Sequence, residues 1–244
     1  MSTRAAQQHR ASRLAAEQAA RQRRQRRRLW WSLSVVVGLI AASLTGYLVH
    51  RAQRPDGGST AAATPLAVAA DGAGVVIGNG PVTVELYSDF LCPACRAFEA
   101  NASDEIDSLL ADGRIRLVYR PVAILDRMST NQYSTRSAAA GGCASDAGKL
   151  AGYAKVLFDN QPAEGGAGHD DEQLIRYGTA AGITDAGFEQ CVRSGRYLHW
   201  VGQVTDAMQA HNVRGTPTVF VAGQQLQRPD GPGLVAAVTA AAAK

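Results

Sequence analysis

The stretch "SDFLCPACRAFE", Ser88–Glu99, places two cysteines three positions apart, directly after an apolar, β-branched run. A proline is tolerated in the first turn of a helix, and apolar residues then recur on one face until Asp112-Gly113. The pattern predicts a strand followed by a helix, with Cys92 at the amino-terminal edge of that helix. Three roles compete for such a pair of cysteines: metal binding, a disulfide that supports the fold, and electron transfer by thiol–disulfide exchange.

The two non-redox roles are poorly supported by the rest of the chain. A structural zinc site commonly uses two close pairs of thiolate or imidazole ligands. The remaining cysteines, Cys143 and Cys191, are far apart, and neither has a Cys or His within four positions. A disulfide across three positions closes a very short loop, which stabilises little on the chain-entropy model. The pattern therefore favours redox chemistry over a metal site.

The position of Cys92 suits that chemistry. Free N–H groups and the positive end of the helix dipole would favour its thiolate, which is the attacking form. Cys95 lies one turn later on the same face, where it can resolve a mixed disulfide. We expect Cys95 to be more buried and less acidic than Cys92.

A second motif, "RGTPTVF", spans Arg214–Phe220. Pro217 cannot complete a central ladder, so it marks the first residue of a strand or an edge. A cis Thr216–Pro217 bond would bend the chain and offer the Thr216 backbone to an extended peptide. An ordinary trans proline at the start of a strand is the alternative.

The remaining pattern predicts an α/β domain. Strands are expected at 74–77, 82–88 and 114–120, followed by a helical stretch over about 129–212. A hairpin that turns at Ala222-Gly223 and a final helix complete the order. A strand–helix–strand unit followed by an antiparallel hairpin gives a mixed sheet with helices on both faces.

The motifs "YSDFLCPAC" and "GTPTVF" together resemble the DsbA-like thiol–disulfide oxidoreductases of the thioredoxin superfamily. The resemblance covers residues 74–244 and implies a thioredoxin-like sheet with an inserted helical domain. It implies Cys92 as nucleophile, Cys95 as resolving thiol, and Pro217 as a cis-proline preceded by Thr216. No cofactor and no metal are expected.

The sequence departs from that family in two places. The "PA" between the cysteines places Ala94 after Pro93, where strong oxidases of the family often carry His. Leu86 stands where many relatives have a buried acid, and strand alternation points Glu85 to the opposite face. Asp89 is the remaining candidate for proton transfer, and it is equally suited to cap the turn or the helix.

Cys143 and Cys191 both fall in the helical stretch. An even number of cysteines outside the cytosol favours pairing. On the chain-entropy model such a bridge contributes about 4 kcal/mol. A structural disulfide is therefore expected, with a relay or two free thiols as the alternatives.

The amino-terminal part carries the positive charge of the chain. Residues 1–28 hold nine arginines and one acid, and Leu29–Val49 runs for 21 residues without a charge. That length spans a hydrocarbon core of ~30 Å as a helix. The positive-inside rule then predicts a cytosolic basic tail over 1–28 and an uncleaved transmembrane anchor over 29–49, rather than nucleic-acid binding. Residues 50–73 are expected to be a flexible linker to an extracytoplasmic domain.

These features predict a monomeric, membrane-tethered oxidoreductase that introduces disulfides into exported proteins. Its expected partners are unfolded or reduced exported proteins, a quinone-linked membrane reoxidant and the lipid bilayer. The same chemistry run backwards gives a reductase or isomerase. A module of the same fold that binds metal or peptide without turnover is the alternative from another class.

Overall fold

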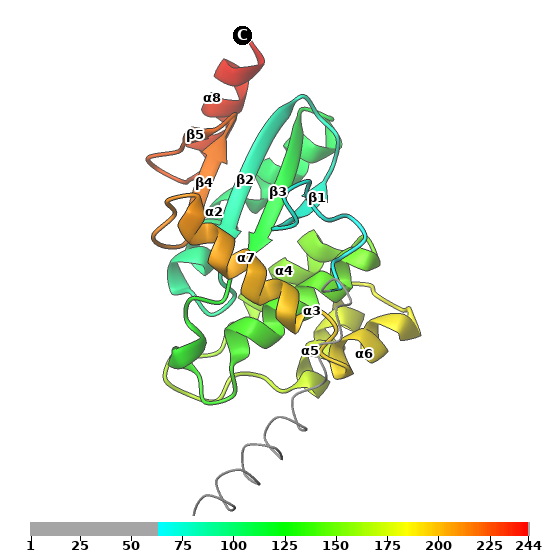
Figure 1. Cartoon of the computed structure of the whole chain (residues 1–244). Helices are drawn as coiled ribbons and strands as arrows, with labels where there is room; N and C mark the ends of the chain where they lie inside the picture. Colours follow the sequence, from blue (N-terminus) through cyan, green and yellow to red (C-terminus); the bar gives the residue numbers. More distant parts are fainter. Residues whose placement is uncertain (1–62, 244) are drawn as a thin grey trace, which may run out of the picture. The chain divides into compact units, whose positions relative to one another are not determined.

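The computed structural model of the chain describes residues 63–243 (Figure 1). The predicted tail and anchor, 1–28 and 29–49, lie outside the described residues. Within residues 63–243, every helix is too short or too polar to cross a bilayer.

A five-stranded mixed sheet forms the centre of the described domain, in the order β1-β3-β2-β4-β5. β2 and β3 run parallel, and the other neighbouring pairs are antiparallel. The strands are β1 (Val75–Ile77), β2 (Val82–Ser88), β3 (Ile115–Pro121), β4 (Thr218–Val221) and β5 (Gln224–Gln225). The predicted mixed sheet is therefore confirmed.

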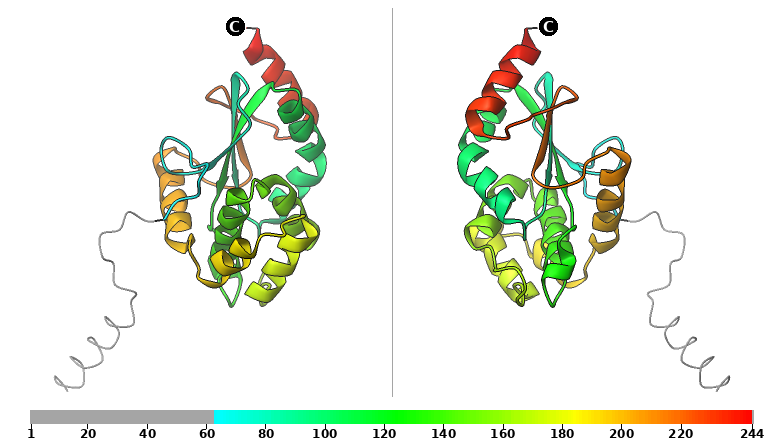
Figure 2. Two further views of the ribbon diagram at one scale, coloured as in Figure 1. Left: turned by 90° about the vertical axis from the view of Figure 1, so that its right-hand side faces the viewer. Right: turned by 90° about the vertical axis from the view of Figure 1, so that its left-hand side faces the viewer.

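Helices cover both faces of the sheet (Figure 2). α2 and α8 pack together on one face, and α7 lies on the other against β3. The helices are α2 (Pro93–Ala111), a 3₁₀ turn η1 (Asp126–Met128), α3 (Tyr133–Asp146), α4 (Leu150–Asp159), α5 (Asp171–Ala180), α6 (Ala186–Arg193), α7 (Leu198–Ala210) and α8 (Gly231–Ala242). The segment from η1 to α7 is the helical insertion between β3 and β4 that the sequence predicted.

α2 carries the paired cysteines because its start and its buried face are fixed by sequence. Cys92 has an extended backbone at the N-cap, and Pro93 follows at the first helical position. Phe98, Ile106 and Leu109 are among the residues that the helix buries. The helix stops where Gly113 adopts a φ of 64°, a conformation that glycine reaches without steric cost.

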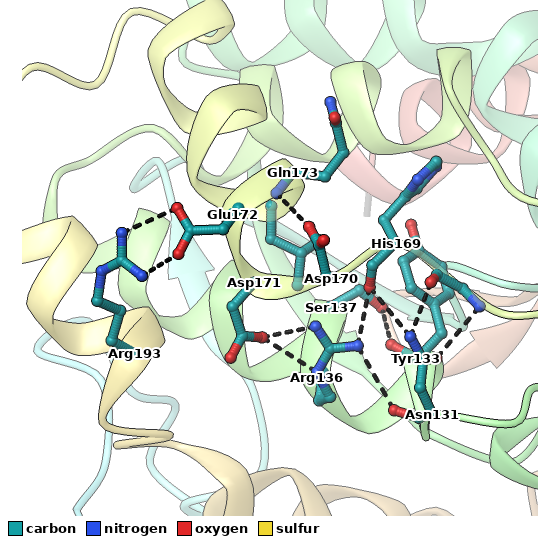
Figure 3. A network of polar contacts seen from close by, with 12 residues as sticks. Asn131, Tyr133, Arg136, Ser137, His169, Asp170, Asp171, Glu172, Gln173 and Arg193 are labelled. Carbon is teal, nitrogen blue, oxygen red and sulfur yellow. Dashed lines mark hydrogen bonds and ion pairs between the residues drawn. The ribbon is translucent and has the colours of Figure 1, made fainter.

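The inserted helices are joined by a disulfide. A polar network, shown in Figure 3, also joins them. Cys143 in α3 and Cys191 in α6 are bonded, as expected. Arg136 in α3 donates to the Asp171 carboxylate and to the backbone carbonyl of His169 at 2.8 Å. Arg193 in α6 pairs with Glu172 in α5. These contacts fix the insertion as a packed unit.

Residues 50–62 of the linker expected over 50–73 lie outside the described residues, and the part from Val68 to Gly72 is docked onto the domain. Val68 pairs with Val75, and the Trp200 indole donates to the Gly72 carbonyl at 2.9 Å. Asp71 forms an ion pair with Arg120 at 2.8 Å. The small polar residues before β1 have no periodic apolar face, so their docking through backbone groups and one carboxylate was not visible in the sequence.

Candidate active site

The two cysteines lie where β2 gives way to α2, and both thiols are free. The Cys92 N–H donates to the Asp89 carbonyl at 3.0 Å, which closes the turn before the helix. Cys92 is 7% exposed and Cys95 is 1% exposed. Both cysteines are thus buried, and Cys95 is the more buried of the two, as the sequence predicted.

The second motif meets the first at this point. The Cys92 thiol donates to the Thr216 carbonyl oxygen at 3.5 Å. Thr216 and Pro217, joined by a cis peptide bond, precede β4, which pairs with β2. Two segments 124 positions apart in the chain are thus brought together at the sulfur atom.

The two thiols are electrostatically unequal. The hydrogen bond from the Cys95 thiol lowers the pKa of Cys92, and it outweighs burial, which acts in the opposite direction. Contacts with Thr216 and with the backbone N–H groups of Ala94 and Cys95 lower this pKa further. Burial raises the pKa of Cys95 well above its ordinary range, and the negative charge on Cys92 adds to the effect. Cys92 is thereby the better nucleophile and the better leaving group.

Asp89 is fully buried and binds the active-site turn to the helical insertion. Its carboxylate accepts hydrogen bonds from the N–H groups of Leu91 and Leu125, both at 2.9 Å, and from the Ser134 hydroxyl at 2.7 Å. Burial raises the pKa of Asp89 to about 6 against these bonds, which lower it. The N-cap of α2 is Cys92 itself, so Asp89 caps the turn and not the helix.

Glu85 is directed away from the cysteines. Its carboxylate accepts from the Arg120 guanidinium at 2.6 Å, and Arg120 also donates to the Ala73 carbonyl. The Tyr87 hydroxyl and His211 Nδ1 lie 2.7 Å apart, and Arg120 lies over the Tyr87 ring. This polar network stabilises the docking of the segment before β1.

Sequence reasoning missed one residue that contacts the site directly. The Gln161 side-chain amide, in the loop after α4, donates to the carbonyl oxygens of Phe90 and Cys92, both at 3.0 Å. Nothing in the surrounding "NQPAEGGAGH" loop pattern predicts this contact, because it depends on how the insertion folds back.

An open groove of about 430 Å³ lies beside Ala94 at the start of α2 and beside Pro217. It is formed by α2, by the cis-proline and by the segment that leads into α8. Its lining includes Ala94, Phe98, Pro217, Pro229 and Pro232. Pro93 and Ala94 are both exposed. The groove is thus a mainly apolar surface bordered by one residue of each sequence motif, Ala94 and Pro217.

Comparison with known proteins points to the same class of protein as the geometry of the two cysteines. The family model described as thioredoxin matches residues 70–238. A crystal structure of oxidised DsbA from Mycobacterium tuberculosis is 33% identical, with a TM-score of 0.62 over 68% of this chain and 91% of that one. The reduced form of a disulfide bond oxidoreductase, DsbG, from the same organism is 31% identical, with a TM-score of 0.61 over 73% of this chain and 86% of that one. The chain belongs to the thioredoxin family, in its class of DsbA-like thiol–disulfide oxidoreductases.

Curated relatives carry a similar segment within longer proteins. The serine/threonine-protein kinase PknE of Mycobacterium tuberculosis is 28% identical over 181 residues, which is 70% of this chain and 32% of the kinase. The Na(+)/H(+) antiporter NhaA 1 of Mycolicibacterium vanbaalenii is 31% identical over 168 residues, which is 66% of this chain and 25% of the antiporter. This chain spans about a third or less of these relatives.

Proposed function

We propose that this protein is a membrane-tethered, extracytoplasmic oxidase that introduces disulfides into exported proteins by dithiol–disulfide exchange. The observation that carries the proposal is the asymmetric pair of thiols: Cys92 beside the Thr216 carbonyl with a lowered pKa, and Cys95 more deeply buried with a raised one. Cys92, Cys95, Thr216 and Pro217 are the proposed catalytic residues, and Pro93, Ala94 and Asp89 support them.

The exchange proceeds in two balanced steps. A client thiolate attacks Cys92 Sγ in the oxidised protein, the Cys92–Cys95 bond breaks, and Cys95 takes the electron pair and a proton. A second client thiolate then attacks the client sulfur of the mixed disulfide, and Cys92 leaves as a thiolate. The client gains a disulfide, and the protein gains two electrons.

The groove and the Thr216 backbone support binding of an extended client segment. The carbonyl of Thr216 lies at the reactive sulfur, where a client main chain can align beside it. The apolar lining from Ala94, Phe98 and the three prolines suits unfolded chains, which expose apolar side chains.

The location and partners follow from the amino-terminal sequence. The charge-free segment 29–49 after an arginine-rich tail supports a single-pass anchor with the domain outside the membrane. A quinone-linked membrane protein would then reoxidise the cysteines. Unfolded or reduced exported proteins are the clients of a monomeric enzyme in this proposal.

The test combines activity and topology. Oxidised full-length protein is mixed with a reduced, unfolded two-cysteine client, with Cys92→Ser as the inactive control. We expect stoichiometric disulfide formation by the parent protein and none by the variant. Protease added to intact cells should digest the 63–243 domain. A client that stays reduced would refute the oxidase proposal, and a domain protected until the cells are lysed would refute the location.

A further inference from the structure

The loop that carries Thr216 and Pro217 joins α7 to β4 (Figure 1). It presents the Thr216 carbonyl oxygen to Cys92 Sγ at 3.5 Å. The loop begins at His211, the C-cap of α7, and ends at Thr218, the first residue of β4. The place of the Thr216 carbonyl beside the sulfur atom therefore depends on how these two ends are held.

A single residue of β2 contacts both ends of this loop. Tyr87 pairs with Thr218 in the antiparallel register of β2 and β4. Its hydroxyl lies 2.7 Å from His211 Nδ1, and the two rings meet edge to face with their centroids 6.3 Å apart. Tyr87 therefore bridges the start and the end of the loop at its base.

The Tyr87 ring is held in a fixed orientation. It is buried, it packs edge to face against Phe220 with centroids 6.2 Å apart, and the Arg120 guanidinium lies 5.4 Å from its centre. Arg120 is itself paired with Asp71 at 2.8 Å and with Glu85 at 2.6 Å. The packing on the ring therefore keeps its hydroxyl directed toward His211.

The Tyr87 hydroxyl is a donor throughout the neutral pH range. Burial raises the pKa of Tyr87 to about 12, against the lowering effect of Arg120. A neutral imidazole accepts such a hydrogen bond at Nδ1 when its proton is on Nε2. Because His211 is exposed, a change of its side chain should leave the core of the domain intact.

We propose that Tyr87 and His211 are positioning residues of the active site. Their hydrogen bond holds the Thr216 backbone in place to pair with an extended client segment. The inference rests on the proposed exchange with client proteins. A peptide that aligns along Thr216 binds more tightly when the loop is already ordered, because less conformational entropy is lost on binding. A small dithiol reacts at Cys92 Sγ without this main-chain pairing, so its reaction should not depend on the bond.

The test compares two reductants of the oxidised full-length protein: a reduced, unfolded peptide with two cysteines, and a small dithiol. Single-turnover rates at increasing reductant concentration give the maximal rate and the half-saturating concentration. Tyr87→Phe removes the hydroxyl and keeps the ring, whereas His211→Ala removes the acceptor. His211→Asn retains an acceptor oxygen close to the place of Nδ1. His199→Ala is the matched control, because His199 is an exposed histidine on α7.

We expect Tyr87→Phe and His211→Ala to react about 10-fold less efficiently with the peptide, a factor that one hydrogen bond typically supplies. The loss should lie in the half-saturating concentration, since the bond supports binding of the peptide before the chemical step. The double variant should be no slower than either single variant, because both changes remove the same bond. His211→Asn should recover most of the loss. The small dithiol should react with every variant at the parental rate, and His199→Ala should match the parent with both reductants.

Three results would overturn the inference while leaving the proposed function intact. They are a parental rate with the peptide in both Tyr87→Phe and His211→Ala, an equal loss with the peptide and the small dithiol, and no recovery in His211→Asn. A parent protein that reacts with the small dithiol but leaves the peptide reduced would instead refute the proposed function.

Discussion

Gln161 donates from its side-chain amide to the carbonyl oxygen of Cys92 at 3.0 Å, and the same nitrogen bonds the Phe90 carbonyl. A residue of the helical insertion thus holds the turn that carries the nucleophile. Asp89 also ties the active-site turn to the insertion, because its carboxylate accepts from the Leu125 N–H and from the Ser134 hydroxyl. The insertion is therefore part of the support of the active site.

The Gln161 link predicts a combined loss of stability and rate. Gln161→Ala leaves two backbone carbonyls without their donor, so the free energy of unfolding should fall by about 1–2 kcal/mol. Exchange with a small dithiol should slow, because the turn that positions Cys92 is less ordered. Urea unfolding and stopped-flow rates measure the two effects, with exposed Gln190→Ala as control. Equal behaviour of the two variants would show that the link is dispensable.

The acidity of Cys92 should depend on the hydrogen bond from Cys95. Because that bond is the largest cause of the lowered pKa, Cys95→Ala should raise the pKa of Cys92 toward the ordinary cysteine range. Cys95→Ser keeps a donor and should raise it less. Thiolate absorbance of the reduced variants as a function of pH gives both values. A Cys92 pKa that is the same in both variants would assign the acidity to the helix amides and Thr216.

Asp89 should make stability depend on pH in a defined window. Its pKa is raised from the ordinary 3.8 to about 6, so between these values the folded protein holds a proton that the unfolded chain has lost. Through this group the free energy of unfolding falls as pH rises from about 4 to about 6, by up to about 3 kcal/mol. The difference in the free energy of unfolding between the parent protein and Asp89→Asn, measured as a function of pH, isolates the contribution of Asp89. A difference that does not vary with pH would contradict the raised pKa.

The Cys143–Cys191 disulfide should support the fold and not the exchange. It joins residues 48 positions apart, so removing it should lower the stability by about 4 kcal/mol and the midpoint of thermal unfolding by about 10 °C. The double variant Cys143→Ser/Cys191→Ser, assayed below its unfolding transition, should retain most of its exchange rate. Loss of exchange in a folded double variant would indicate a redox relay.

The local features of the fold were predictable from sequence. Pro93 and the recurring apolar residues marked α2, and the run before Ser88 marked β2 with the bounds that the structure has. The glycines at 148, 182 and 195 separated the inserted helices because each adopts a positive φ there. Cys92, Cys95 and Pro217 were identified because each lies in a short motif whose residue types and spacing indicate a chemical role.

The supporting contacts were not predictable. Gln161 belongs to no motif, and its contact with the turn that carries Cys92 depends on how the helical insertion folds back onto α2. The docking of Asp71 onto Arg120 was missed for the same reason. Such contacts join segments distant in the chain, and a single sequence contains no signal for them.

The reduction potential of the Cys92–Cys95 pair, measured against glutathione in the full-length protein, tests the central claim most directly. The lowered pKa of Cys92 stabilises the reduced form, which makes the disulfide more oxidising. We therefore predict a potential nearer ~−120 mV, the value of a strong oxidase, than ~−270 mV, the value of thioredoxin. A potential near ~−270 mV would contradict the oxidase proposal and favour a reductase.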